Sequence, residues 1–236
     1  MRLLLTRPEA DAQRTAATLR AQGHAVHNAP LLRVELLSDA TIDDGPWAAL
    51  LITSANAAAA IAAHARMTQM RELPVFTIGQ RTAHAASAAG FANVTSAAGN
   101  VGDLARFVAA RMRPTGRLLY LAGEDRSGDL AGDLRAHGFA VDMTVVYRAV
   151  AATGLPAAAA TALTQGIDGV LHFSKRSAET YVATARGAGI LANALKPVHF
   201  CLSAQVAAPL REAGAADIRV APQPAEAALL ALIGPA

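Results

Sequence analysis

The sequence contains few of the residues that several common functions require. Aromatic residues make up 4% of its 236 residues, too few for the stacking platforms that bind single-stranded nucleic acid. Cys201 is the only cysteine, so the chain can form no internal disulfide and offers no thiolate zinc site. Its seven histidines show no HExxH or similar ligand spacing. We therefore expect neither a metal nor a nucleic-acid partner.

Long apolar runs are also missing. No stretch of roughly eighteen apolar residues with few polar ones occurs, and the amino-terminal run Leu3–Leu5 is too short for a signal peptide. We expect a cytoplasmic protein with no membrane partner. Hydrophobic residues make up 53% of the chain, which predicts a packed globular core. The net charge of +3 suits an anionic ligand, although the basic residues are scattered.

The motifs that bind nucleotides or activate a nucleophile are absent. No GxGxxG opens a helix, and neither GxxxxGK[ST] nor GxSxG occurs. We therefore expect no cofactor. An enzyme with this sequence would have to act mainly by positioning its substrate.

The chain contains an internal duplication. Residues 2–33 align without gaps on residues 117–148, and the matches extend beyond alanine to arginine, leucine, glutamate, glycine and valine. Residues 50–65 then resemble 170–185, aligned at a shared serine. Residues 74–94 resemble 197–218, with Pro74-Val75 placed on Pro197-Val198. A period above 100 residues indicates a duplicated domain and not a solenoid repeat.

Short apolar runs alternate with longer helical stretches in each copy. Leu3–Leu5, Leu51–Thr53 and Val75–Ile78 have the pattern of buried parallel strands. The stretch Glu9–Gln22 has apolar residues on one face and ends before Gly23, as a helix does. This alternation predicts an α/β protein with two doubly wound parallel-sheet domains of duplicated origin.

Polar clusters follow the expected strands. In such sheets ligands bind beyond the carboxyl ends of the strands, where free helical amides can receive a carboxylate or phosphate. A serine or threonine at such a junction is more often a simple helix cap than a ligand contact. The clusters begin at Thr6, Thr53, Gly79, Gly123, Phe173 and Ser203.

Six motifs in register resemble the uroporphyrinogen-III synthase family over nearly the whole chain. They are TRP at 6–8, TSANA at 53–57, IGQRTA at 78–83, VVYR at 145–148, FSKRSA at 173–178, and G-x-x-V after the helices. Each motif alone is degenerate, whereas six in order around a duplication are much more specific.

The resemblance implies a discontinuous domain arrangement joined by a two-stranded β-ladder hinge. Domain one would comprise 1–36 plus 152–236, and domain two 37–150. The duplicated stretches Leu31–Leu37 and Val145–Ala151 would form the ladder. Sequence patterning alone instead favours two consecutive domains divided near Pro114.

The resemblance also implies a reaction. The substrate would be hydroxymethylbilane, a linear tetrapyrrole with eight carboxylates, and the product uroporphyrinogen III with ring D inverted through a spiro intermediate. Without enzyme the same substrate closes to the uninverted type I isomer. The protein would therefore supply geometry, and members of the family are generally monomeric.

The resemblance places the family's site residues at matching positions of this sequence. Tyr147 matches a hinge tyrosine that could act as an acid in departure of the hydroxyl, or could pack with its hydroxyl satisfied. The remaining candidates for substrate binding are Thr6, Arg7, Ser54, Asn56, Thr82, Arg126, Arg148, Ser174, Lys175, Arg176 and Ser203. The arginines could equally be solvated surface charges.

The last junction departs from the family pattern of glycine followed by two threonines. Here it contains Ser203 and Gln205, either of which could substitute, and the basic pair Lys175-Arg176 could compensate. Two other functions stay open. One is a two-lobed binding protein for an anionic small molecule without catalysis. The other is a glycosyl or phosphoryl transferase, for which only Glu124-Asp125 offers a carboxylate pair.

Overall fold

The computed structural model describes residues 1–126 and 128–234. The chain divides into two compact units. Unit 1 contains Met1–Arg33 and Val150–Ala236, and unit 2 contains Val34–Ala149. The chain therefore starts in unit 1, builds unit 2 and returns to unit 1. Pro114 lies inside unit 2, so the units are not divided there.

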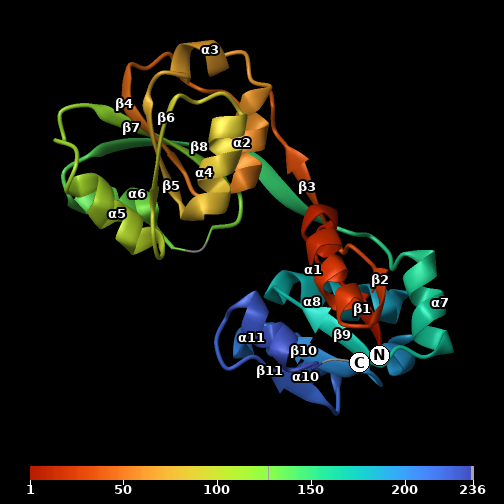
Figure 1. Cartoon of the computed structure of the whole chain (residues 1–236). Helices are drawn as coiled ribbons and strands as arrows, with labels where there is room; N and C mark the ends of the chain where they lie inside the picture. Colours follow the sequence, from red (N-terminus) through yellow and green to blue (C-terminus); the bar gives the residue numbers. More distant parts are fainter. Residues whose placement is uncertain (127, 235–236) are drawn as a thin grey trace. The chain divides into compact units, whose positions relative to one another are not determined.

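Unit 1 is a parallel five-stranded sheet in the order β11-β10-β9-β1-β2, with helices on both faces (Figure 1). Its strands are β1 (Arg2–Leu5), β2 (Ala25–Asn28), β9 (Gly169–His172), β10 (Val198–Cys201) and β11 (Ile218–Val220). Its helices are α1 (Glu9–Ala21), α7 (Ala157–Gln165), α8 (Lys175–Gly187), α9 (Leu191–Ala194), α10 (Ala204–Ala213) and α11 (Glu226–Ala231).

Unit 2 contains the second sheet except for the first residues of β3 and the last of β8; this sheet has six strands in the order β3-β8-β7-β4-β5-β6. The strands are β3 (Leu32–Leu36), β4 (Trp47–Ile52), β5 (Pro74–Ile78), β6 (Asn93–Ala97), β7 (Arg117–Gly123) and β8 (Ala140–Ala151). The helices are α2 (Ala55–Ala62), α3 (Met67–Met70), α4 (Gly79–Ala88), α5 (Val101–Ala109) and α6 (Leu130–Ala136). From β8 to β6 all neighbouring strands are parallel.

Each sheet separates two apolar cores, because successive side chains of a strand point to opposite faces. In β1, Leu4 packs with α8 and α10, whereas Leu3 and Leu5 pack with α1. In β4, Leu50 and Ile52 pack with α2, while the alternate residues pack with α5 and α6. The prediction of two parallel sheets covered on both faces is confirmed.

The element prediction also holds for the first helix. It spans Glu9–Ala21, and the residues predicted to form its apolar face, Ala12, Ala16 and Leu19, are fully buried. Gly23 follows with a φ of 90°, a conformation that favours glycine after a helix. Among the described residues, no helix is long and apolar enough to cross a membrane.

The two sequence repeats exchange parts in the folded chain. The first repeat supplies β1, α1 and β2 to unit 1 but β4, β5 and β6 to unit 2; the second supplies β7, α6 and β8 to unit 2 but β9, β10 and β11 to unit 1. The resulting orders β2-β1-β9-β10-β11 and β8-β7-β4-β5-β6 are equivalent. Each unit therefore combines the beginning of one repeat with the remainder of the other.

Strand register corrects one detail of the repeat alignment. In unit 1 Val170 pairs with His199, and in unit 2 its counterpart Leu50 pairs with Val75. Val75 therefore corresponds to His199 and not to Val198, as the match of Pro74-Val75 with Pro197-Val198 implied. The aligned prolines misled because Pro74 lies inside β5, whereas Pro197 precedes β10.

Strands β3 and β8 are neighbours at the edge of the sheet in unit 2. The amide of Leu37 donates to the Val146 carbonyl at 2.8 Å, and the amide of Ala152 donates to the Leu31 carbonyl at 2.9 Å. Residue numbers rise along one strand as they fall along the other, so the strands run antiparallel. Both passages of the chain between the units occur within these two strands.

Candidate functional site

Three of the predicted serines are helix caps at the carboxyl ends of strands. The hydroxyl of Ser54 accepts from the Asn56 amide at 3.2 Å at the start of α2. Ser174 accepts from the Ser177 amide at 3.1 Å at the start of α8, and Ser203 caps α10. These hydroxyls fix where the helices begin and so where their free amides lie.

Thr82 is not a cap. It is the fourth residue of α4, which begins at Gly79, and its side chain is 6% exposed. Thr82 cannot be the cap of this helix, because the helix starts directly at Gly79, the residue that follows β5. Gly79 has a φ of 73°, which lets the chain turn from strand into helix without a separate capping residue.

A cavity of about 360 Å³ opens at the carboxyl ends of the strands in unit 2. Its wall is contributed by the carboxyl ends of β4, β5 and β7, by Tyr147 in the middle of β8, and by the start of α5. The lining residues are Thr53, Ser54, Ile78, Gly99, Asn100, Val101, Tyr120, Gly123, Asp125, Arg126 and Tyr147. Three sequence candidates, Ser54, Arg126 and Tyr147, therefore meet in one cavity.

Hydroxyl groups form the inner part of this cavity. The hydroxyls of Tyr120 and Thr53 are 3.1 Å apart and hydrogen-bonded. Burial raises the pKa of Tyr120, so this phenol stays protonated and can donate at neutral pH. Tyr147 is half-buried and close enough to Tyr120 to raise its pKa further.

Arg126 supplies the positive charge of the cavity. Its Nη1 donates to the carbonyls of Gly123 and Glu124, each at 3.0 Å, which holds the guanidinium at the end of β7. The side chain is exposed, so the other donors of the guanidinium are open to a ligand. A cation beside two phenols, an asparagine and the Asp125 carboxylate is suited to a polar group.

The other candidates of unit 2 do not line this cavity. Asn56 lies in the first turn of α2, and Thr82 is buried in α4. Arg148 lies on β8, where its Nη2 and Nε reach the Glu35 carboxylate of β3 at 3.0 and 3.3 Å. These hydrogen bonds raise the pKa of Arg148. The guanidinium thus links the two strands.

In unit 1, Thr6 and Arg7 follow β1. The Thr6 side chain is fully buried, and its hydroxyl donates to the Leu171 carbonyl of β9 at 2.9 Å. Arg7 lies over the Phe173 ring at 4.1 Å and pairs with Glu226 of α11 at 3.0 Å. Its guanidinium also donates to Thr15. Both side chains therefore have structural partners within unit 1.

The basic pair after β9 is more open. Lys175 is exposed and lies 3.6 Å from the Glu179 carboxylate one helical turn later. Arg176 is half-buried beside it in the first turn of α8. With the caps Ser174 and Ser203, these residues mark the carboxyl ends of β9 and β10. The structure thus brings the unit 1 candidates to one edge of the sheet.

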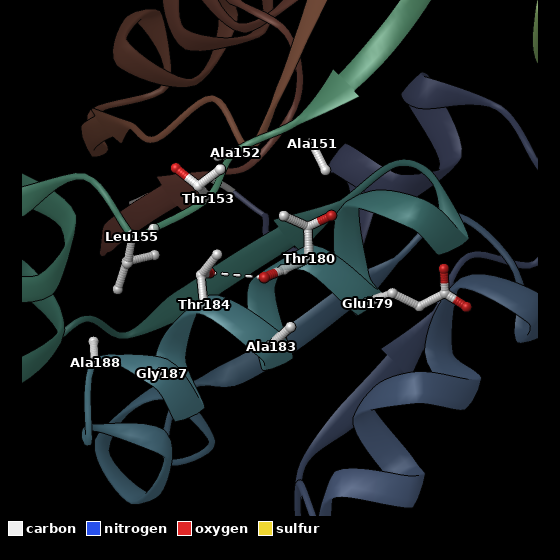
Figure 2. A pocket seen from close by; sticks show the side chains of 11 residues that line it. Ala151, Ala152, Thr153, Leu155, Glu179, Thr180, Ala183, Thr184, Gly187 and Ala188 are labelled. Atoms are coloured by element: carbon white, nitrogen blue, oxygen red, sulfur yellow. Dashed lines mark hydrogen bonds between the residues drawn. The ribbon is translucent and has the colours of Figure 1, made fainter.

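A larger cavity of about 590 Å³ lies elsewhere in unit 1, between the segment 151–155 and the side of α8 (Figure 2). It is lined mostly by alanine and glycine. The hydroxyls of the two threonines on α8 are used within that helix: Thr180 donates to the Arg176 carbonyl at 2.8 Å and Thr184 to the Thr180 carbonyl at 2.7 Å. Size alone therefore does not make it the candidate site.

Among the described residues, no group of three histidine, cysteine or acidic side chains could hold a metal. Cys201 is buried, and burial raises the pKa of its thiol to about 12. Two histidines, His172 and His199, lie in the core of unit 1 with a 3.1 Å hydrogen bond between their rings. Burial lowers the pKa of both, so they are neutral core residues.

Comparison with known proteins decides the family. The model of the family described as Uroporphyrinogen-III synthase HemD matches residues 13–231. The chain belongs to the uroporphyrinogen-III synthase family. Membership identifies it as a cyclising lyase of tetrapyrrole biosynthesis with a small tetrapyrrole substrate. Among curated proteins, no sequence matches the chain.

Solved structures of the family share the fold. The chain is similar to the uroporphyrinogen-III synthetase of Helicobacter pylori with a TM-score of 0.68 and 17% identity, covering 99% of this chain and 98% of the other. It is similar to a mutant synthase of the extremely thermophilic bacterium Thermus thermophilus with a TM-score of 0.52 and 16% identity, covering 99% and 96%. At these identities the likeness supports the fold alone.

Sequence reasoning missed two residues of the unit 2 cavity. Tyr120 is hidden in the apolar run LLYLA of β7, where only its polar tip distinguishes it from core. Asn100 forms a capping box with Asp103 at the start of α5. The sequence Asn-x-x-Asp before an apolar helix was the available signal for this second junction.

Proposed function

We propose that this chain converts hydroxymethylbilane into uroporphyrinogen III by cyclodehydration with inversion of ring D. The supporting observation is the family match across residues 13–231, together with a cavity of hydroxyl groups and a cation at the strand ends of unit 2. The product would then feed haem, sirohaem or cobalamin synthesis.

The substrate carboxylates would be bound at the carboxyl ends of the strands. In unit 2 the proposed groups there are Ser54, Asn56, Thr82 and Arg126, with Arg148 added from within β8. In unit 1 they are Thr6, Arg7, Ser174, Lys175, Arg176 and Ser203. Free amides at the helix starts and nearby guanidinium groups favour carboxylates electrostatically, and the net charge of +3 has the matching sign.

The proposed chemistry balances without an external reagent. The nitrogen of the terminal pyrrole that carries the hydroxymethyl group supplies an electron pair. This pair expels the hydroxyl, which leaves as water after taking up one proton. The substituted α-carbon of ring D attacks the resulting azafulvene, forming the spiro intermediate. The bond from that carbon to the methylene that links it to ring C then breaks. The other α-carbon of ring D bonds to this methylene, and loss of a proton from that carbon restores the pyrrole. The net change is loss of one water.

Tyr147 is the proposed proton donor to the departing hydroxyl. Its ring lines the cavity of unit 2, beside the hydrogen-bonded pair of Tyr120 and Thr53. The larger task is geometric, because the unassisted substrate closes to the type I isomer. Holding ring D so that its substituted carbon attacks would favour the closure that the unassisted substrate does not take.

We also propose that units 1 and 2 correspond to the two domains expected from the sequence, 1–36 plus 152–236 and 37–150, joined by β3 and β8. The protein would act as a cytoplasmic monomer, without cofactor or metal and without nucleic-acid or membrane partners. Its single buried cysteine is compatible with a reducing compartment.

The test is incubation of the purified protein with freshly prepared hydroxymethylbilane, followed by oxidation and separation of type I and type III uroporphyrins. The expected result is mainly type III, against type I in the blank without protein. A product mixture identical to the blank would contradict the proposal. If calorimetry then detected binding of the substrate, the alternative of a non-catalytic two-lobed binding protein would be favoured.

A further inference from the structure

The pairing of β7 with β8 changes register at its carboxyl end. The strands pair residue by residue from Arg117 with Ala140 to Ala122 with Val145, and Gly123 then pairs with Tyr147. Val146 is skipped, and its side chain is buried in the core of unit 2. In an unbroken register Gly123 would face Val146. The shift therefore brings Tyr147 beside the last residue of β7, as bulges next to functional sites commonly do.

The ring of Tyr147 occupies the space that a side chain at residue 123 would fill. A Cβ atom on Gly123 would lie 2.5 Å from Cζ, 2.6 Å from Oη and 2.9 Å from Cε1 of Tyr147. These distances are far below the roughly 3.5 Å at which carbon atoms make favourable contact. The phenol end of Tyr147 therefore lies directly against the bare backbone of Gly123.

The backbone of Tyr147 is held by the sheet, whereas the position of its ring depends on the space left by the missing side chain of Gly123. Its carbonyl accepts from the Glu124 amide at 3.0 Å, which continues the pairing of the two strands beyond Gly123. The Gly123 carbonyl accepts from Arg126, so the same glycine also holds the cation of the cavity. A bulkier residue at 123 could be accommodated only by movement of the phenol.

We propose that Gly123 is a positioning residue: its lack of a side chain places the Tyr147 phenol in the unit 2 cavity beside Thr53, Tyr120 and Arg126. The inference rests on the proposed function, in which this phenol assists departure of the hydroxyl. Gly123 does not have the positive φ that would itself require glycine. The need for glycine at this position is thus steric and concerns one neighbouring side chain.

Replacement of Gly123 by alanine is consequently a selective change. The atoms that the new methyl would meet are at the far end of the Tyr147 side chain, so the ring can shift while the sheet remains intact. The phenol keeps its chemistry but moves by about 1 Å. A displacement of this size at a reacting group can cost up to about 100-fold in rate.

The first experiment compares Gly123→Ala, Tyr147→Ala and the double variant by steady-state kinetics and product analysis. We expect Gly123→Ala to lower kcat by roughly 10- to 100-fold with KM changed less than about threefold, because the phenol acts in the chemical step. In the Tyr147→Ala background the same substitution should have no further effect, since the obstructed ring is gone.

The matched control is Gly187→Ala at the end of α8. Gly187 also lacks a positive φ, and a Cβ there would meet no atom within 4 Å. This variant should retain the wild-type kcat. Thermal unfolding of all variants would show that Gly123→Ala retains the fold.

A second measurement is independent of activity. The chain has three tyrosines, so selective ¹³Cζ labelling gives three resonances, and Tyr147→Phe identifies one of them. Gly123→Ala should shift the Tyr147 resonance strongly and leave that of Tyr181 in unit 1 unchanged.

The outcomes separate the inference from the proposed function. If the wild-type protein forms no type III product, the proposed function fails, and an unchanged Tyr147 resonance in Gly123→Ala would overturn the positional claim as well. If the wild type is active, a wild-type kcat in Gly123→Ala, or a loss that adds fully to that of Tyr147→Ala, would overturn the inference.

Discussion

Units 1 and 2 share one sheet plan but differ at its centre. Ser54 and Ser174 cap the helices that follow β4 and β9, so these two strands are equivalent. Two residues before each cap, unit 2 has Ile52 where unit 1 has His172. The neighbouring strand differs in the same way. Its register places His199 of unit 1 at the position that Val75 has in unit 2.

The two histidines form a buried polar pair where unit 2 has an aliphatic contact. Nε2 of His172 lies 3.1 Å from Nδ1 of His199, and Tyr181 packs edge-on against both rings. Within the described residues, the outer nitrogens of the pair have no hydrogen-bond partner, although the Leu195 carbonyl lies close enough to favour protonation of His199. The duplicated plan thus tolerates two different interiors, and unit 1 has the costlier one.

Removing one histidine should produce the largest difference in stability between the two units. His172→Ala leaves a cavity and deprives His199 of its hydrogen bond, so we expect a loss of about 3–4 kcal/mol in the free energy of unfolding of unit 1. Hydrogen exchange measured by mass spectrometry would locate the loss in peptides of unit 1. A loss in the peptides of unit 2 would contradict the separation of the two cores.

The control for that prediction copies the interior of unit 2. The double variant His172→Ile with His199→Val replaces both partners, so no polar group is left unpaired. We expect its stability to lie within about 1 kcal/mol of the wild type or above it. A much larger loss would mean that the histidine pair contributes more than the aliphatic contact.

Lowering the pH should destabilise unit 1 relative to unit 2 by slightly less than His172→Ala does. Burial lowers the pKa of His199 from about 6.5 in an unfolded chain to about 4. Because the folded state favours neutral histidine, the stability is complete above pH 6.5 and falls as the pH drops from 6.5 toward 4. The expected loss is about 3 kcal/mol by pH 4. Of the neighbouring groups, Asp217 opposes the shift, and Tyr181 and Cys201 stay neutral.

The measurement is urea unfolding at a series of pH values. Hydrogen exchange monitors the unfolding of unit 1, and fluorescence of Trp47 monitors that of unit 2. Trp47 is the only tryptophan, and it is buried in unit 2. In the His172→Ile, His199→Val variant, unit 1 should lose less stability between pH 6.5 and 4. The remaining loss should be the part that protonation of carboxylates causes. An identical pH dependence in the variant would exclude the histidines as its source.

The arginines that follow β1 and β7, the first strand of each repeat, give the smallest expected difference in stability. Arg7 in unit 1 is held by Glu226, Thr15 and the Phe173 ring, so Arg7→Ala should cost about 1–2 kcal/mol of stability. Arg126 in unit 2 is exposed, and its guanidinium donates to two neighbouring backbone carbonyls. Its replacement should change stability by less than about 0.5 kcal/mol.

Thermal unfolding of both arginine variants checks this order. Equal costs would show that the partners of Arg7 contribute little. Kinetic measurements add a second contrast, because Arg126→Ala removes the cation of the cavity and should lower activity without loss of fold.

The sequence was sufficient to predict the sheets because their signals are local. Apolar runs such as Leu3–Leu5 and the apolar face of Glu9–Gln22 specify buried strands and an amphipathic helix. The discontinuous arrangement of the units could not be derived in this way. Strand pairs such as β1 with β9 join residues more than 160 positions apart, and no local pattern near Pro114 shows that unit 2 continues across it.

Without the family resemblance, candidate residues could be predicted only at the junctions where strands lead into helices. Ser54, Ser174 and Ser203 were predicted at such junctions because caps have a sequence signature, and the structure places each at a helix start. Tyr120 was missed because a tyrosine in an apolar strand resembles core. The contact of Gly123 with Tyr147 depends on a register shift between two strands, which no property of either strand alone reveals.

The central claim is that the protein controls which carbon of ring D attacks. The most direct measurement is the type III fraction of the uroporphyrin formed from one fixed amount of hydroxymethylbilane as the protein concentration is raised. The account predicts a fraction that climbs from the blank value toward complete type III as enzymatic closure overtakes the unassisted reaction. A fraction that stays at the blank value at every protein concentration would contradict it.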